Sequence, residues 1–241
     1  MSNPTAAMLV IGDEILSGRT RDANAYHLAR RLVQVGIDLR EIRVVPDDHD
    51  AIVDALNALR EAHTHVFTSG GIGPTHDDIT ADAVADAFHV GIDVRDDARL
   101  HLQAAVGAAR VLTAEHLRMA RIPTGAELIV NRISGAPGFS ISNVHVMAGV
   151  PEIFAVTLDE LLPRLESGEP VLSRELRFDV GEGRIAAPLR DLAAELPTLS
   201  LGSYPFRDDA GYGTNIVVRG TDTALIDRAI QRLEAIRSSL P

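Results

Sequence analysis

The spacing of apolar and polar positions predicts alternating strands and helices in the first ninety residues. Short apolar runs that end in glycine, proline or serine are typical of buried strands, and apolar residues three or four apart indicate helices. This order is typical of a mostly parallel sheet covered by helices on both faces. The strands are expected at Met8–Gly12, Ile37–Val45 and His65–Ser69, and the helices at Asn24–Val35, Asp48–Ala62 and Asp77–Phe88.

The pattern is weaker in the middle of the chain. Asp96–Arg121 is helical by spacing, and Glu127–Val130 is expected to be a strand. A turn at Ser134–Gly138 leads into a predicted hairpin. The hairpin comprises Phe139–Ile141 and Val144–Met147, and a helix is then expected from Pro151 to about Leu165.

Composition changes at Ser167-Gly168-Glu169-Pro170, which predicts a linker between two domains, residues 1–167 and 168–241. The second domain has a β-α-β-β-α pattern. Its expected elements are strand Val171–Phe178, helix Gly183–Glu195, strands Leu199–Tyr204 and Asn215–Arg219, and helix Thr223–Arg237. The predicted fold class is therefore α/β, with a small C-terminal α+β domain.

Charge and composition exclude several classes of function. The 241 residues carry a formal net charge of −11, so we expect no nucleic acid and no membrane as partner. The chain contains neither lysine nor cysteine, which excludes a Walker lysine, a Schiff base, a thiolate nucleophile and cysteine-bound zinc. Neither a signal peptide nor a membrane-spanning stretch is evident, so a cytoplasmic protein is expected.

Three glycines, Gly70, Gly71 and Gly73, lie between a predicted strand and the helix that follows it. Ligands of open α/β sheets bind at this edge, where backbone N–H groups and a helix N-terminus favour a phosphate. His76 occupies the position of the last glycine in a dinucleotide fingerprint, so that motif is absent. A plain tight turn is the alternative reading of the glycines.

Carboxylates follow all three predicted strands. Asp77 and Asp78 come directly after the glycine loop, Asp13 and Glu14 follow the first strand, and Asp47 follows the second. Helix capping explains one aspartate at each position but not this convergence. Two carboxylates would repel a phosphate unless a cation lies between them, and Mg²⁺ commonly binds one or two carboxylates plus phosphate oxygens. The pattern therefore indicates a shared metal–phosphate site.

The histidines indicate less. His63 and His65 share one face of a strand without a third ligand, so we interpret them as structural. His76, in the glycine loop, is equally well a ligand contact or a solvated residue. Gly181-Glu182-Gly183 has the wrong spacing and an acidic residue for an RNA-binding loop.

Several motifs, in order, resemble the N-terminal domain of CinA, the competence/damage-inducible protein, which belongs to the molybdopterin-binding (MoaB/Mog-like) superfamily. The resemblance covers residues 5 to about 165. Residues 170–241, with "LGSYPF", look like the KH-type middle domain of the same proteins. The motifs are "GDEILSGRTRDAN", "VVPDD", "GGIGPTHDDIT", "IPTGAELIVNRISGAPGF" and "MAGVPEIF".

The resemblance implies a three-layer α/β/α domain that is often oligomeric, so a homo-oligomer is expected. It implies catalytic roles for Asp47 and Asp78, and a divalent metal, Mg²⁺ or similar, held by Asp47, Asp77 and Asp78. No haem, flavin cofactor or iron–sulfur cluster is expected. The implied ligand-binding residues are Gly12, Asp13, Glu14, Asn24, Gly70, Gly71, Gly73, Pro74, Thr75, Pro137, Gly138, Gly149 and Pro151.

Two departures from the family are visible. The family's C-terminal deamidase domain is not expected here, and the usual Pro-Gly before the last motif reads Ala148-Gly149. Three hypotheses follow. The first is metal-dependent hydrolysis of a nucleoside-diphosphate compound such as ADP-ribose or FAD. The second is adenylylation of molybdopterin in molybdenum cofactor biosynthesis. The third is binding of a pterin or nucleotide without turnover.

Overall fold

The computed structural model describes residues 3–107, 109–209 and 211–240. The chain divides into two compact units, Met1–Gly168 and Glu169–Pro241. The proposed site lies in the first unit, so the second is described only briefly.

A six-stranded sheet in the order β2-β1-β3-β8-β7-β6 forms the centre of the first unit. Strands β2, β1, β3 and β8 run parallel to one another, whereas β7 is antiparallel to both β8 and β6. The parallel strands therefore all end at one edge. The strands are β1 (Thr5–Ile11), β2 (Asp38–Val45), β3 (His65–Ser69), β6 (Glu127–Ile129), β7 (Gly138–Ile141) and β8 (Val144–Met147).

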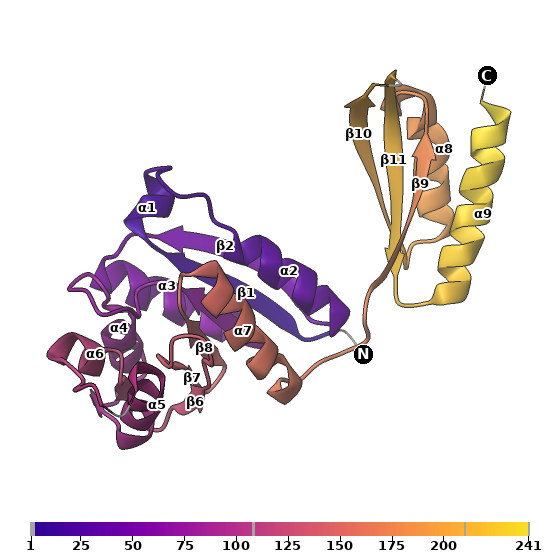
Figure 1. Ribbon diagram of the computed structural model, residues 1–241. Coiled ribbons are helices and arrows are strands. Elements are labelled where there is room, and N and C mark those ends of the chain that lie inside the picture. The colour runs from indigo at the N-terminus through magenta and orange to yellow at the C-terminus, as the bar shows by residue number, and fades with distance from the viewer. Residues whose placement is uncertain (1–2, 108, 210, 241) are drawn as a thin grey trace. The chain divides into compact units, whose positions relative to one another are not determined.

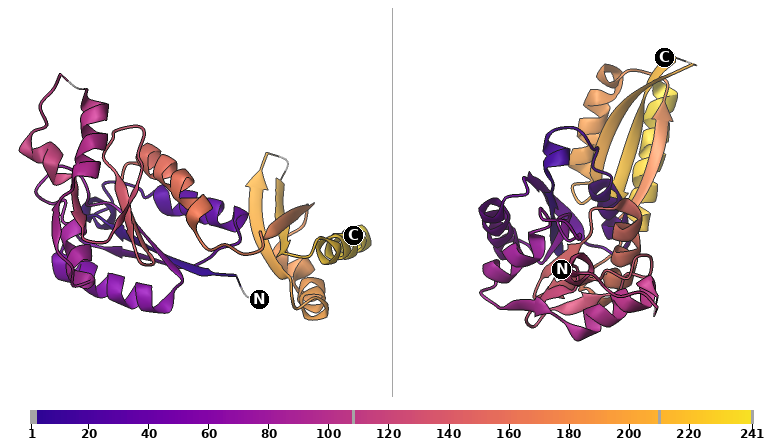
Figure 2. Two further views of the ribbon diagram at one scale, coloured as in Figure 1. Left: turned by 90° about the horizontal axis from the view of Figure 1, so that it is seen from below. Right: turned by 60° about the vertical axis from the view of Figure 1, so that its left-hand side comes forward.

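Helices cover both faces of this sheet (Figures 1 and 2). Alternate side chains of β1 enter two separate cores: Leu9 packs with α3 (His49–Ala62) and α4 (Thr80–Ala87), and Met8 packs with α2 (Asn24–Gln34) and α7 (Pro151–Leu161). Successive strand residues point to opposite faces, so a strand with helices on both sides must be apolar throughout. The predicted three-layer α/β/α architecture is confirmed.

Two predicted helices were wrong in their extent. Helix α4 begins at Thr80, not at Asp77, because the Thr80 hydroxyl donates to the carbonyl of Gly70 (3.0 Å) and closes a loop before the helix. The predicted helix Asp96–Arg121 is two helices, since Gly107 ends the first with a φ of +96° and Thr113 caps the second. These are α5 (Asp96–Val106) and α6 (Ala114–Arg118).

Four short elements were not predicted. Helix α1 (Asp13–Leu16) follows β1 directly. Strands β4 (Ile92–Val94) and β5 (Arg121–Pro123) pair antiparallel in a small sheet beside α4. A 3₁₀ turn, η1 (Leu162–Arg164), extends α7.

The second unit is a three-stranded antiparallel sheet in the order β10-β11-β9, with two helices against one face. Its elements are β9 (Leu172–Phe178), α8 (Glu182–Glu195), β10 (Ser200–Asp208), β11 (Gly211–Gly220) and α9 (Thr223–Ser239). In both units, no helix among the described residues combines the length and apolar composition needed to cross a bilayer.

Candidate functional site

The parallel strands end beside a cavity of about 530 Å³, which we name the loop cavity. Its volume is within the range of small-molecule sites. Of the residues predicted to bind ligand or metal, nine line it: Glu14, Asp47, Gly70, Gly71, Gly73, Pro74, Asp77, Asp78 and Gly149. The predicted convergence of acidic strand ends on the glycine loop is therefore a feature of the fold.

The glycines of the loop are required by its backbone. Gly70 has a φ of +110°, and a Cβ there would lie 2.1 Å from the carbonyl oxygen of Ile11. Gly71 has a φ of +67°, and its Cβ would lie 2.1 Å from the hydroxyl oxygen of Thr80. Both conformations disfavour any side chain. The loop is thus folded tightly onto β1 and α4, and its backbone lines the cavity.

Asp78 is held in place by its own loop. The backbone N–H and the hydroxyl of Thr75 both donate to Asp78 Oδ2, at 2.8 and 2.6 Å. Outside α4, Asp78 contributes nothing to the first turn of that helix, which was the alternative explanation for an aspartate here. Its carboxylate lines the loop cavity instead.

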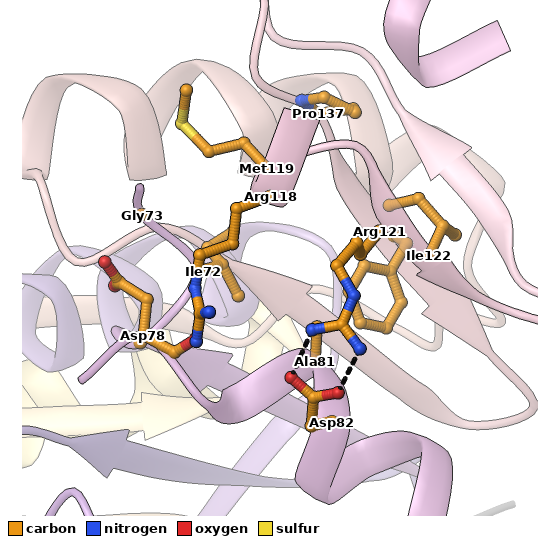
Figure 3. A pocket seen from close by; sticks show the side chains of 12 residues that line it. Ile72, Gly73, Asp78, Ala81, Asp82, Arg118, Met119, Arg121, Ile122 and Pro137 are labelled. Carbon is orange, nitrogen blue, oxygen red and sulfur yellow. Dashed lines mark hydrogen bonds and ion pairs between the residues drawn. The ribbon is translucent and has the colours of Figure 1, made fainter. Parts of the chain in front are cut away.

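Arg118 is a contributor that sequence reasoning missed. Its Nη2 donates to the carbonyl oxygens of Asp78 (3.0 Å) and His76 (3.4 Å), which bracket the two aspartates. Figure 3 shows its guanidinium beside Asp78, while Arg121 nearby forms an ion pair with Asp82. Arg118 comes from the end of α6, forty residues beyond the loop. No local motif pointed to it.

The surroundings of Asp47 raise the pKa of its carboxyl group. Its Oδ2 accepts the backbone N–H of Asp13 at 2.9 Å. Partial burial raises the pKa of Asp47 above its ordinary value; the Asp13 N–H opposes this, and the negative charges of Asp13, Glu14 and Asp77 add to it. A bound cation would relieve this repulsion. By contrast, the side chain of Asp48 accepts a hydrogen bond from the backbone N–H of Ala51 and so caps the N-terminus of α3, as is common for an aspartate at this position.

The donor set suits a hard divalent cation. Glu14, Asp47, Asp77 and Asp78 offer carboxylate oxygens, which Mg²⁺ prefers, around one cavity. Within the described residues, however, no three acidic, histidine or cysteine side chains form a ready-made metal cluster. An ion bound by these residues would need further oxygen ligands, such as those of a phosphate.

Asn24 is buried at the start of α2 and joins three elements. Its side-chain Nδ2 donates to the hydroxyl of Ser69 and to the carbonyl of Gly149, both at 2.8 Å. These bonds tie α2 to the ends of β3 and β8. Asn24 lines a separate small cavity of about 70 Å³ together with Pro151. It is placed beside the loop cavity and supports its wall.

The remaining predicted residues do not line the loop cavity. Gly12 and Asp13 lie at the start of α1, where the backbone N–H of Asp13 donates to the carboxylate of Asp47. Thr75 faces the other side of the loop. Pro137 borders the small hollow drawn in Figure 3, and Gly138 packs in β7 against the carbonyl of Val146.

The rest of the loop cavity is mostly apolar. Its wall includes Ile72, Met119, Val150 and Ile153. Asn131 closes the Asn131–Ala136 turn, donating to the Ser134 hydroxyl (2.7 Å) and the Ala136 carbonyl (2.9 Å). The cavity thus has both acidic and apolar lining residues, which suits a ligand with a charged group and a ring.

Comparison with known protein families gives two matches. The family model described as "Probable molybdopterin binding domain" matches residues 7–167. The model described as "FAD synthase, middle domain" matches residues 170–239. The second unit, compared above with KH-type middle domains, is thus matched by the model of a FAD synthase middle domain.

Individual relatives agree with these matches. A "Probable FAD synthase" of Caenorhabditis elegans is 31% identical over 96% of this chain and 50% of its own length. A "CinA-like protein" of Citrifermentans bemidjiense is 36% identical over 83% of this chain and 48% of its own. The chain thus spans about half the length of both relatives. Among solved structures, the CinA protein of Thermoplasma acidophilum, described as of unknown function, is 32% identical over 68% of this chain and 99% of its own, with a TM-score of 0.63.

Proposed function

The chain belongs to the family of "Probable molybdopterin binding domain" proteins and is CinA-like, and we propose that it hydrolyses the pyrophosphate bond of a nucleoside-diphosphate compound. The proposed substrate class is that of FAD and ADP-ribose, and the proposed cofactor is a divalent metal ion such as Mg²⁺. The products from FAD would be FMN and AMP.

One observation carries this proposal: a single cavity joins a glycine loop to four carboxylates. A phosphate alone is repelled by Glu14, Asp47, Asp77 and Asp78, and a metal alone finds no complete ligand cluster among the described residues. A pyrophosphate with its metal ion would suit both parts of the cavity, since the phosphate oxygens can contact the glycine loop while the ion binds the carboxylates.

The residues of the site suit a hydrolytic step. The metal ion, when bound, would neutralise charge on the phosphoryl oxygens and hold them in line. Backbone N–H groups of the glycine loop would orient the pyrophosphate. Asp47 would accept a proton from the attacking water, because its carboxylate belongs to the lining of the cavity beside the glycine loop. Attack of water on one phosphorus would break its bond to the bridging oxygen and give two monophosphates. AMP keeps the bridging oxygen if the other phosphorus is attacked, and gains the oxygen of water if its own phosphorus is attacked.

FAD is the first substrate to test, because relatives of both units carry the name FAD synthase. The second candidate function is molybdopterin binding, with or without adenylylation, and the family's description favours it. The two differ in their requirements. Hydrolysis needs no ATP and releases AMP, whereas adenylylation consumes ATP and yields an adenylylated pterin.

The test is to incubate purified protein with FAD, ADP-ribose or NAD and with Mg²⁺, Mn²⁺ or Co²⁺, and to measure AMP by chromatography. We expect AMP from at least one compound, dependent on metal and abolished by EDTA. Asp78→Asn should remove the release, with an unchanged circular dichroism spectrum. Absence of AMP under all conditions would refute the hydrolase and favour molybdopterin with ATP as the next assay.

We also propose that the chain forms a homo-oligomer. Light scattering coupled to size exclusion measures this directly. A mass near the 25.9 kDa of one chain at micromolar concentration would contradict it.

A further inference from the structure

The tip of the glycine loop separates the loop cavity from a second hollow of the same size, about 530 Å³, which we name the outer hollow. Pro74 lies on the wall of both. The outer hollow is lined by Pro74, Thr75, His76, Val94, Ala114, Glu115, Leu117, Arg118 and Arg121. Both volumes are within the range of sites for small organic ligands.

We propose that the first unit is built for compounds in which two ring-bearing halves are joined by a pyrophosphate. In this arrangement the pyrophosphate lies at the glycine loop, the adenylyl half occupies the loop cavity, and the second ring occupies the outer hollow. This inference rests on the proposed function and narrows its substrate class. A compound with one ring, such as ADP-ribose, leaves the outer hollow without a ring.

The lining of the outer hollow suits an uncharged flat ring. Val94, Leu117 and Pro74 supply apolar surface, and Val94 is 39% exposed, which is unfavourable unless something covers it. A second phosphate is less suitable, because Glu115 lies on the same wall. The occupant is therefore expected to bind by burial of apolar area and not by charge.

The cations around the hollow are already committed elsewhere. Arg121 donates to both oxygens of Asp82, at 2.8 and 2.6 Å. Arg118 donates to the carbonyl oxygens of His76 and Asp78. These bonds fix the two guanidinium groups beside the hollow, so they act as rigid walls on which a ring can stack.

Arg118 lines the outer hollow and also hydrogen-bonds the segment that lines the loop cavity. The carbonyls that it holds bracket Asp77 and Asp78, which line the loop cavity. A ring that packs on Arg118 therefore contacts a residue that positions the carboxylates. Pro74 lies on the wall of both hollows, so one ligand that crosses the loop tip can occupy both.

The test compares two identical substitutions at exposed valines. Val94→Gln places a longer polar side chain in the outer hollow. Val111→Gln makes the same change at a valine that is 88% exposed and lines none of the described cavities near the loop. KM and kcat are measured for FAD and for ADP-ribose with Mg²⁺, and thermal midpoints confirm that both variants are folded.

We expect Val94→Gln to raise KM for FAD about fivefold or more, in line with lost apolar burial, and to change kcat and KM for ADP-ribose by less than about twofold. Val111→Gln should change nothing. Equal effects of Val94→Gln on both substrates, no effect on either, or the same effect from Val111→Gln would overturn the inference while the hydrolase stands.

Failure of the hydrolase is recognised separately, as absence of AMP with the wild-type chain. In that case the inference is tested by binding. Flavin fluorescence anisotropy measures the affinities for FAD and FMN, and competition with FAD measures the affinity for ADP-ribose. Tighter binding of FAD than of FMN or ADP-ribose, weakened about fivefold by Val94→Gln, supports two ring sites. Equal affinities, or an unaffected Val94→Gln variant, overturn it.

Discussion

Two buried histidines at the opposite edge of the sheet provide the sharpest prediction about stability. His145 Nε2 lies 3.4 Å from His65 Nδ1, and both residues are more than nine-tenths buried. His65 Nε2 lies 3.0 Å from the carbonyl oxygen of Glu166, which can only accept, so His65 must donate there and accept from His145. His145 in turn accepts at Nδ1 from the Ser140 hydroxyl (2.9 Å). Every polar atom of the pair is satisfied with both rings neutral.

Protonation of His145 costs folding free energy. Burial, and secondarily the neighbouring His65, lowers the pKa of His145 from 6.5 to about 3. Between these two values the unfolded chain binds a proton that the folded chain rejects. Stability is therefore full above pH 6.5 and falls as pH decreases toward 3. At 1.36 kcal/mol for each pH unit, the loss from this group between pH 7 and pH 5 is about 2 kcal/mol.

The assay is urea unfolding of wild type and of His145→Gln at pH 7 and pH 5. A glutamine can both donate and accept but does not titrate, so the difference in unfolding free energy between the two pH values should shrink by about 2 kcal/mol. His101→Gln, a change at an exposed histidine of α5, should leave the difference as in wild type. An unchanged pH difference in His145→Gln would refute the neutral buried pair.

Three further outcomes test the site. Asp47→Asn keeps an acceptor for the Asp13 N–H but removes the base, so kcat should fall about 10²- to 10⁴-fold without loss of stability by thermal denaturation. With AMP present, Mg²⁺ affinity by calorimetry should weaken on acidification at a higher pH than for an ordinary aspartate, because the pKa of Asp47 is raised; Asp47→Asn should shift that dependence to lower pH. Gly71→Ala should destabilise by more than about 1 kcal/mol, since its Cβ meets Thr80 at a positive φ, whereas Gly183→Ala in α8, with open space around it, should be neutral or stabilising.

The sheet and its covering helices could be predicted because their signal is local. A strand buried on both faces is continuously apolar, as Met8–Ile11 is, and a covering helix repeats its apolar residues, as Leu28 and Leu32 do. Parallel strands ending at one edge then bring Asp47 and the glycine loop together without further information. The convergence of the site followed from topology alone.

The parts that were missed depend on contacts between distant residues. The start of α4 is displaced to Thr80 by a hydrogen bond to Gly70, a tertiary contact that competes with the helical preference of the intervening residues. Strands β4 and β5 have three residues each, too few to show a period, and their paired residues lie twenty-seven or more positions apart in the sequence. Arg118 serves the loop through backbone carbonyls, which leave no trace in the sequence of the loop.

The charge of the site predicts that the binding of a pyrophosphate and the binding of a metal ion depend on each other. Four carboxylates line the loop cavity of a chain whose net charge is already −11. A pyrophosphate adds negative charge to this cavity, and two unit charges 4 Å apart repel by about 4 kcal/mol at an effective dielectric constant of 20. A divalent cation between them reverses the sign of that term, so nucleotide and metal must each raise the affinity of the other by the same factor. Under the proposed function, the acidic residues beside the glycine loop would therefore bind the two ligands together, and either ligand alone is expected to bind more weakly than the pair.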